Sequence, residues 1–262
     1  MTKIIAITNR KGKVGKSTTA VNLSIAFANS GKKTLLVDLD SAGSCAKAFG
    51  FDKKETPKNI FRGTNSSLAF RRSILKTEIK NLDLIYIKSL PYLDSIKSGG
   101  INANVHILES TLKPATINYS YIIIDCPPHH TDTITAALIA ADSVLIPVAP
   151  EKFSTSALSN VIQQIDEIKE DYNSELSIDG ILMTNYEFNN DSSFKLKKEL
   201  FKKYPKLVFS TSIPKSPAVT KALDENIPLL IYKPDDRASK AYVKAADELI
   251  ERKNLFNSKR KN

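Results

Sequence analysis

The sequence predicts an α/β fold in a single domain, with a mostly parallel, twisted sheet and helices on both faces. Short apolar runs recur along the chain with helix-patterned stretches between them, which is the pattern of a buried parallel sheet with crossover helices. A chain of 262 residues with 42% hydrophobic content can bury one large core. No break in composition favours a second domain.

Six apolar runs are expected to be the buried strands. They are KIIAIT near residue 3, TLLVDL at 34, LDLIYI at 82, YIIID at 121, SVLIPV at 143 and DGILMT at 179. Between the first two runs, Val21, Ile25 and Ala28 share one helical face, and Gly31 supplies a stop. The opening third of the chain is therefore expected to be strand, loop, helix and strand.

Further helices are expected at about 154–170, 192–204 and 236–253, where apolar residues three and four positions apart lie among lysines and acids. Residues 1–253 are expected to form the domain, and residues 254–262 a frayed basic tail.

The two cysteines, Cys45 and Cys126, lie far apart and lack CxxC spacing. This spacing indicates neither a zinc cluster nor a disulfide framework. We expect both to be small fillers of the core or of a loop.

A phosphate-binding loop is predicted directly after the first apolar run. The segment NRKGKVGKSTT contains Gly15, Lys16 and Ser17, the GK[ST] ending that stands at the mouth of a helix. Backbone N–H groups there can bind phosphate oxygens, and the helix N-terminus favours negative charge. Lys16 can reach the β and γ phosphates, and Ser17 can bind Mg²⁺. The chain is therefore expected to be a P-loop NTPase.

The loop departs from the ordinary consensus G-x-x-x-x-G-K-[ST], because Arg10 stands where the first glycine is required, and Lys11 precedes Gly12. KGKVGKST is similar to the deviant Walker A signature, KGGxGK[ST], of the ParA/MinD family of ATPases. The resemblance implies a homodimer formed with ATP, in which Lys11 contacts the ATP of the partner subunit. It implies ATP and Mg²⁺ as cofactors. The loop residues expected to bind the nucleotide are Lys11, Gly12, Lys13, Val14, Gly15, Lys16, Ser17 and Thr18.

Other segments extend the resemblance over nearly the whole chain. VDLDSAG at 37–43 resembles VDxDPQG of the family, which implies that Asp40 positions the attacking water and joins Lys11 and Lys16 as a catalytic residue. YIIIDCPP at 121–128 looks like the Walker B segment, which implies that Asp125 holds the Mg²⁺ site with Ser17. ADSVLIPVAPEKFSTSALSN, GILMTN and IPKSPAVTKA follow the segment order of chromosomal, Soj-like and small plasmid ParA proteins. Asn185 and Pro214 are accordingly expected near the adenine.

Two departures from the family pattern bear on hydrolysis. Lys13 replaces the second glycine of the loop, and if that position needs a positive φ, the side chain costs on the order of 1 kcal/mol. Ser41 and Ala42 replace the proline and glutamine that follow the catalytic aspartate. His129 and His130 follow Asp125 in a switch-like loop and are expected to be solvated.

Lysines cluster on and just after the helix expected at 192–204. The sequence carries 38 Lys and Arg against 28 Asp and Glu, a net charge of +10 that suits a phosphate-rich partner. Family members carry DNA-contacting arginines in this region and in the IPKSPAVTKA segment, so the resemblance implies a contact set rebuilt with lysine, which suits nonspecific phosphate contact. The expected DNA-binding residues are Lys198, Lys202, Lys203, Lys215 and Lys221.

The resemblance implies an ATP-dependent dimerising switch for segregating plasmid or chromosomal DNA. The ATP dimer is expected to bind nonspecific DNA and to hydrolyse ATP slowly under stimulation by a ParB-like centromere-binding partner. The apolar face of the C-terminal segment is short, there is no basic leader, and no run approaches the roughly 20 apolar residues that span a bilayer. A membrane partner is thus disfavoured, and a cytoplasmic, nucleoid-associated protein is expected.

The sequence leaves three alternatives open. One is a MinD-like or FlhG-like positioning ATPase, and another is a nucleotide-dependent scaffold whose hydrolysis is nearly lost. A metabolic P-loop enzyme, such as dethiobiotin synthetase or nitrogenase reductase, shares the fold. The reductase is disfavoured because the cluster cysteines have no counterpart beyond Cys126, and the synthetase because no substrate pocket is apparent.

Overall fold

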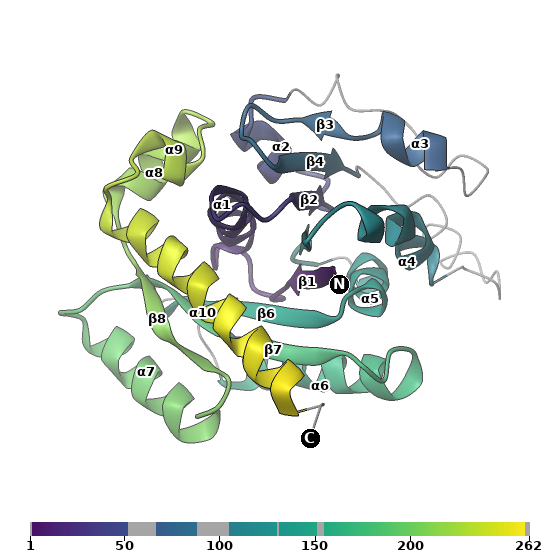
Figure 1. Ribbon diagram of the computed structural model, residues 1–262. Coiled ribbons are helices and arrows are strands. Elements are labelled where there is room, and N and C mark those ends of the chain that lie inside the picture. The colour runs from purple at the N-terminus through teal and green to yellow at the C-terminus, as the bar shows by residue number, and fades with distance from the viewer. Residues whose placement is uncertain (1, 52–66, 88–104, 130, 151–154, 260–262) are drawn as a thin grey trace.

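The computed structural model describes residues 2–51, 67–87, 105–129, 131–150 and 155–259. One eight-stranded sheet runs through it in the order β3-β4-β2-β5-β1-β6-β7-β8 (Figure 1). The strands are β1 (Lys3–Ile7), β2 (Thr34–Asp38), β3 (Leu75–Lys76), β4 (Leu82–Tyr86), β5 (Tyr121–Asp125), β6 (Ser143–Val148), β7 (Ser177–Tyr186) and β8 (Val208–Pro214). Every neighbouring pair is parallel except β3 with β4. The expected mostly parallel sheet is confirmed.

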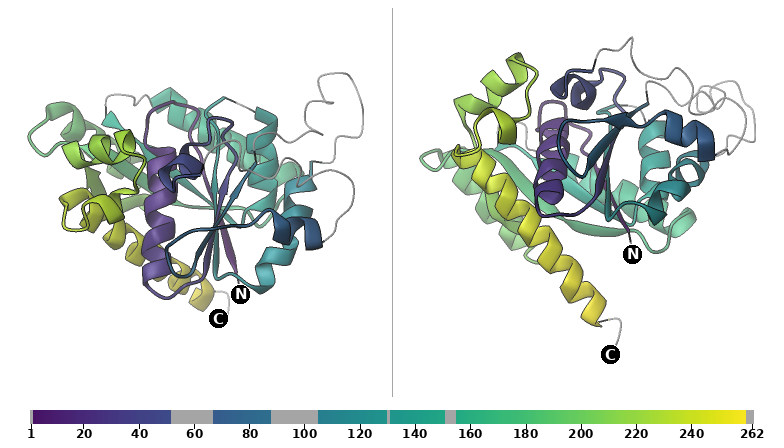
Figure 2. Two further views of the ribbon diagram at one scale, coloured as in Figure 1. Left: turned by 90° about the horizontal axis from the view of Figure 1, so that it is seen from above. Right: turned by 45° about the horizontal axis from the view of Figure 1, so that its top comes forward.

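Helices cover both faces of the sheet, as the sequence predicts. They are α1 (Lys16–Asn29), α2 (Ser44–Ala48), α3 (Ser67–Arg72), α4 (Ile107–Leu112), a 3₁₀ helix (Lys113–Ile117), α5 (Thr131–Ala140), α6 (Thr155–Asp171), α7 (Asp191–Lys203), α8 (Pro217–Asp224), α9 (Leu229–Tyr232) and α10 (Arg237–Lys259). The view from above in Figure 2 shows the strands between α1, in purple, and the teal helices α4 and α5. This is a three-layer α/β arrangement.

The two core clusters follow from the alternation of side chains along each strand. Ile5 and Ile7 of β1 belong to a buried cluster with Phe27 of α1 and Tyr242 of α10. Ile4 and Ala6, which point to the other face, belong to a cluster that includes side chains of α4, α5, α6 and α7. The strands are buried on both faces, and for this reason they appear in the sequence as continuous apolar runs.

The expected helices are found with small differences at their ends. The helix expected at 154–170 is α6, and the one expected at 192–204 is α7. The last helix was expected to end near 253, and α10 continues to Lys259. The division into a domain at 1–253 and a basic tail at 254–262 stays a prediction.

Two strands of the structure were not predicted. β8 lies at the edge of the sheet, and Ser210, Thr211 and Ser212 in its middle are exposed or half-buried. β3 has two residues and forms the opposite edge, antiparallel to β4. Edge strands need no continuous apolar run, and the sequence therefore gives little signal for them.

Within the described ranges, no helix is both long enough and apolar enough to cross a membrane.

Gly180 provides a test of the packing between β7 and β8. A Cβ atom at this position would lie 2.4 Å from Cε2 of Phe209 and 2.6 Å from the carbonyl oxygen of Leu207. Gly180→Ala is therefore expected to lower the free energy of unfolding by about 1–3 kcal/mol, through overpacking. Chemical denaturation measures the change. Ser177→Ala at the half-exposed start of β7 is the control and should stay within about 0.5 kcal/mol of the parent. Equal stability of the two variants would contradict this packing.

Candidate nucleotide-binding site

The loop between β1 and α1 is fixed by two polar side chains that the sequence reasoning did not single out. Asn9 is buried, donates from Nδ2 to the carbonyl of Pro147 at 2.8 Å, and accepts from the backbone N–H of Lys11 at 3.0 Å. The hydroxyl of Thr184, on β7, lies 2.9 Å from the carbonyl oxygen of Val14 and 3.2 Å from that of Val148. The loop is therefore attached at both ends to neighbouring strands.

Two residues of the loop adopt left-handed backbone conformations. Gly15 has φ 79° and opens α1, and the nearest atoms to a Cβ there would be 3.7 Å away, so conformation rather than crowding favours glycine. Lys13 has φ 60°. This position therefore does have the positive φ on which the expected cost depended, and a lysine there is unfavourable by on the order of 1 kcal/mol.

Lys16 is the first residue of α1 and lies inside the site. Its side chain donates to the carbonyl oxygen of Lys11 at 3.0 Å, and the residue is 7% exposed. Burial lowers the pKa of its ammonium group, and the charges of Asp125, Cys126 and Asp40 act in the opposite direction. No side chain of the described residues caps the N-terminus of this 14-residue helix, and its first turn holds no acidic residue. Such a terminus is suited to an anion.

Two carboxylates lie side by side across the site, at the carboxyl ends of β2 and β5. Asp38 and Asp125 are register partners in the parallel pair, and both are fully buried. Asp38 accepts backbone N–H groups from Asp40 at 3.1 Å, Cys45 at 2.9 Å and Ala46 at 3.1 Å. Burial raises the pKa of both carboxyl groups, and at Asp38 the neighbouring Asp125 raises it further. Ionisation of both carboxyl groups is therefore unfavourable unless a cation is bound nearby.

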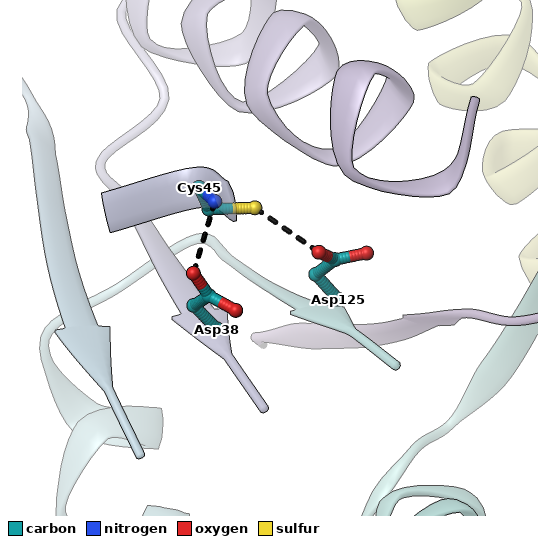
Figure 3. Close-up of side chains that lie close together, drawn as sticks. All are labelled: Asp38, Cys45 and Asp125. Carbon is teal, nitrogen blue, oxygen red and sulfur yellow. Dashed lines mark hydrogen bonds between the residues drawn. The ribbon is translucent and has the colours of Figure 1, made fainter. Parts of the chain in front are cut away.

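The thiol of Cys45, on α2, points toward Asp125, and the backbone N–H of Cys45 donates to Asp38 (Figure 3). Its Sγ lies 3.2 Å from Oδ2 of Asp125, and the thiol is fully buried. Burial, with the charges of Asp125 and Asp38, raises the pKa of this thiol well above its usual value, so Cys45 donates as a protonated thiol. Cys45 and Cys126 are both buried and free, as expected of small fillers, but Cys45 also faces the site.

Asp40 stands in a turn that leads from β2 to α2. Its carboxylate accepts the N–H of Ala42 at 2.9 Å, and its carbonyl accepts the N–H of Gly43 at 2.8 Å. Tyr86 of β4 donates to the carbonyl of Ser41 at 2.9 Å, beneath the turn. Asp40 is half-buried and close enough to Lys16 to act on its charge. The turn thus holds a partly exposed carboxylate at the edge of the loop.

Asn185 and Pro214 lie at the same edge of the sheet. Asn185 directly follows Thr184, which contacts the loop, and it is exposed with φ 50°. Pro214 ends β8 and pairs in register with Tyr186. The structure brings these two residues to the region of the loop, and contact with an adenine stays a prediction.

The lysines expected to contact DNA are on the surface in two places. Lys198, Lys202 and Lys203 are exposed on α7, and Nζ of Lys203 lies 3.2 Å from the hydroxyl of Ser159. Lys221 is exposed on α8, and Lys215 forms an ion pair with Glu187 at 3.0 Å. Arg237, at the start of α10, donates to the carbonyl of Lys215 and was not singled out from the sequence.

His129 is exposed after β5, as expected, and His130 lies outside the described residues.

Two observations indicate that the site fits a nucleoside triphosphate with Mg²⁺. Oδ1 of Asp125 is buried and has no hydrogen-bond partner among the described residues, which is a position for a cation or its hydration shell. Among the described residues, the side chain of Lys16 donates only to a backbone carbonyl, at the N-terminus of a helix that none of them caps, where a phosphate oxygen would be the stronger acceptor. Ser17 and Asp125 are the residues that could hold the metal ion.

Comparisons with known proteins agree with this site. A family model described as an AAA domain matches residues 2–178. The chain is 32% identical to the sporulation initiation inhibitor protein Soj of Bacillus subtilis over 254 residues, which cover 95% of this chain and 98% of Soj. It is 30% identical to the chromosome partitioning protein ParA of Caulobacter vibrioides, covering 95% of this chain and 94% of ParA. Its fold is similar to that of cobyrinic acid a,c-diamide synthase from Mycobacterium smegmatis with bound ATP analogue and magnesium, with a TM-score of 0.79 and 22% identity over 95% of each chain.

The fold and the loop define a P-loop ATPase with a deviant Walker A motif. Within that class, the chain belongs to the ParA/Soj family. The expected family, fold and ATPase class are confirmed.

The raised pKa values of the paired carboxyl groups predict how the free energy of unfolding depends on pH. A carboxyl group whose pKa is raised by folding stabilises the folded state at low pH, and this contribution is lost as pH rises from about 4 through the raised pKa. Asp125→Asn removes one charge, so at pH 8 the nucleotide-free variant should be more stable than the parent by about 1–3 kcal/mol. The gain should shrink toward pH 4.

Chemical denaturation at several pH values measures this effect. Asp224→Asn, at an exposed position on α8, is the control and should show no such pH-dependent gain. The stabilisation that ATP and Mg²⁺ give the parent should also be lost in Asp125→Asn. A variant less stable than the parent at pH 8 would contradict the proposed charge excess.

Proposed function

We propose that this protein is an ATP-dependent dimerising switch for the segregation of plasmid or chromosomal DNA. Its ATP dimer binds nonspecific DNA, and a ParB-like centromere-binding partner stimulates its slow hydrolysis. The observation that carries the proposal is the position of Lys11, which is exposed at the mouth of a loop in which Lys16 is already turned inward. The similarity to Soj and ParA over nearly the whole chain supports it.

Each residue of the site has a part in this proposal. Lys16 exchanges the carbonyl of Lys11 for phosphate oxygens, while the N–H groups of residues 12–18 bind the phosphates. Ser17 and Asp125 hold Mg²⁺, which when bound neutralises the charge that develops on the phosphates. Asp40 orients the attacking water from its turn. Lys11 reaches across to the ATP of the partner subunit, and Asn185 and Pro214 contact the adenine.

Dimerisation and hydrolysis are coupled by the incomplete site. Phosphoryl transfer depends on positioned charge, and one subunit lacks the cation that its partner provides. ATP therefore joins two subunits, and loss of the γ-phosphate removes the contacts that hold them. The protein acts as a slow switch in the cytoplasm, on the nucleoid.

A matched pair of lysine variants tests the role of Lys11. Lys11→Ala should still fold and bind ATP but should remain a monomer with ATP and Mg²⁺, as measured by light scattering. Lys32→Ala, which removes an exposed lysine just beyond α1, should dimerise like the parent. An ATP-dependent dimer of Lys11→Ala would exclude the proposed contact across the interface.

The DNA contacts are proposed for the exposed lysines of α7, Lys198, Lys202 and Lys203, together with Lys215 and Lys221. Replacing Lys198 by Ala should reduce the slope of log affinity against log salt by about 1, because each phosphate contact releases about one counterion. Lys244→Ala, at an exposed position on α10, should leave the slope unchanged. Fluorescence anisotropy with a short duplex measures both. Equal slopes for parent and Lys198→Ala would remove this residue from the contact set.

A second candidate function has some support in the loop itself. Lys13 is held at φ 60°, and Ser41 and Ala42 are exposed in the turn after Asp40, where the family has proline and glutamine. These features favour a nucleotide-dependent scaffold with little hydrolysis. Phosphate release with and without DNA and partner separates the two, because a segregation switch must turn over. A MinD-like or FlhG-like positioning role would instead leave DNA affinity independent of nucleotide.

A further inference from the structure

Three buried side chains from separate elements meet beside the phosphate loop. Asp38 ends β2, Cys45 lies in α2, and Asp125 ends β5 (Figure 3). One oxygen of each carboxylate and the Sγ of Cys45 all lie within 4.8 Å of one another. All three residues are 0% exposed. They form a compact set of potential metal ligands, which we call the thiol–carboxylate cluster.

Hydrogen bonds fix this cluster but do not complete it. Three backbone N–H groups from the turn and from α2 orient the carboxylate of Asp38. The thiol of Cys45 donates to Oδ2 of Asp125, and Oδ1 of Asp125 has no hydrogen-bond partner among the described residues. A buried carboxylate oxygen without a partner is costly, and a cation would relieve it.

The donor atoms of the cluster select the kind of cation. Mg²⁺ prefers oxygen ligands in an octahedral arrangement and disfavours sulfur, whereas Zn²⁺ accepts thiolate together with carboxylate and commonly takes four ligands. Three protein ligands leave one position open. With the thiol deprotonated, the cluster carries three negative charges, which a divalent cation and the ammonium group of Lys16 would balance.

We propose that Asp38, Cys45 and Asp125 bind a thiophilic divalent cation of the Zn²⁺ class in the nucleotide-free protein. On binding, the S–H bond of Cys45 breaks, a sulfur–metal bond forms, and the proton passes to solvent. Both carboxylates bind as anions. The spacing of the cysteines did not indicate this site, because two of its ligands are aspartates, and one of them, Asp125, lies 80 residues beyond Cys45 in sequence.

The site has a regulatory consequence. Asp125 cannot serve the thiophilic cation and the Mg²⁺ of a bound nucleotide in the same way at once, so the two should compete. A metal–sulfur bond would also hold α2, which follows the turn of Asp40, against the end of β5. This consequence rests on the proposed nucleotide site, whereas the cation binding does not.

Cobalt is the probe of choice, because thiolate bound to Co²⁺ gives a near-ultraviolet charge-transfer band that nitrogen and oxygen ligands do not give. The reduced, metal-free, full-length protein is titrated with Co²⁺ without nucleotide. We expect a band that saturates at one ion per chain and is bleached by Zn²⁺. The band should be lost in Cys45→Ser and kept in Cys126→Ser, the matched control at the other buried cysteine.

Several outcomes would overturn the site. They are the absence of a band in the parent protein, a band that survives in Cys45→Ser, or one that disappears in Cys126→Ser alone. Circular dichroism checks that the variants fold, and Cys45→Ala serves in place of Cys45→Ser should the serine variant fail to fold. Exposed histidines that bind Co²⁺ do not produce the band, so they cannot imitate it.

Adding ATP and Mg²⁺ to the cobalt-loaded protein tests the competition, and the band should then fall. The result is separable from the proposed function. A protein that binds DNA with ATP but shows no band would lack the cation site alone. A band in a protein that does not bind DNA with ATP would instead count against the segregation role and leave the cation site in place.

Discussion

The negative charge of two neighbouring strand ends governs the rest of this site. The parallel register of β2 and β5 places Asp38 beside Asp125, and the core on either side keeps both from water. Burial of two like charges is unfavourable unless cations or hydrogen bonds answer it. Part of this negative charge is stabilised by the ammonium group of Lys16, by three backbone N–H groups and by the thiol of Cys45. The remaining negative charge favours the binding of a divalent cation.

The surrounding elements can be understood as supports of this arrangement. Thr184 and Asn9 tie the loop to β6 and β7, so that Lys16 is held over the carboxylates. The turn that carries Asp40 continues into α2, whose N–H groups bind Asp38. A change in the bound cation or phosphates would therefore alter the positions of the turn, of α2 and of the exposed surface around Lys11. In the proposed switch, this connection would link the bound ligand to the exposed surface around Lys11.

Much of the fold and the nucleotide loop could be predicted from the sequence, for physical reasons. Strands such as β1, β5 and β6 are buried on both faces, so their apolar runs are continuous. The GKS motif at the start of α1 specifies a loop whose backbone N–H groups can bind phosphate. The strand β8 escaped because its middle is polar at the sheet edge. The contacts of Thr184 and Cys45 escaped because they join residues distant in sequence, whose meeting depends on strand order and register. For Thr184, its place in GILMTN, just before Asn185, was the available signal.

The most direct test of the central claim is the nucleotide dependence of DNA binding by the unmodified protein. Affinity for a nonspecific duplex is measured with ATP and Mg²⁺, with ADP, and without nucleotide, across a salt series. Tight binding is expected only with ATP and Mg²⁺, with log affinity falling against log salt at a slope of about −4 to −5 for about five phosphate contacts per dimer. Binding that is absent, or equal in all three states, in protein shown to bind ATP would contradict a segregation switch.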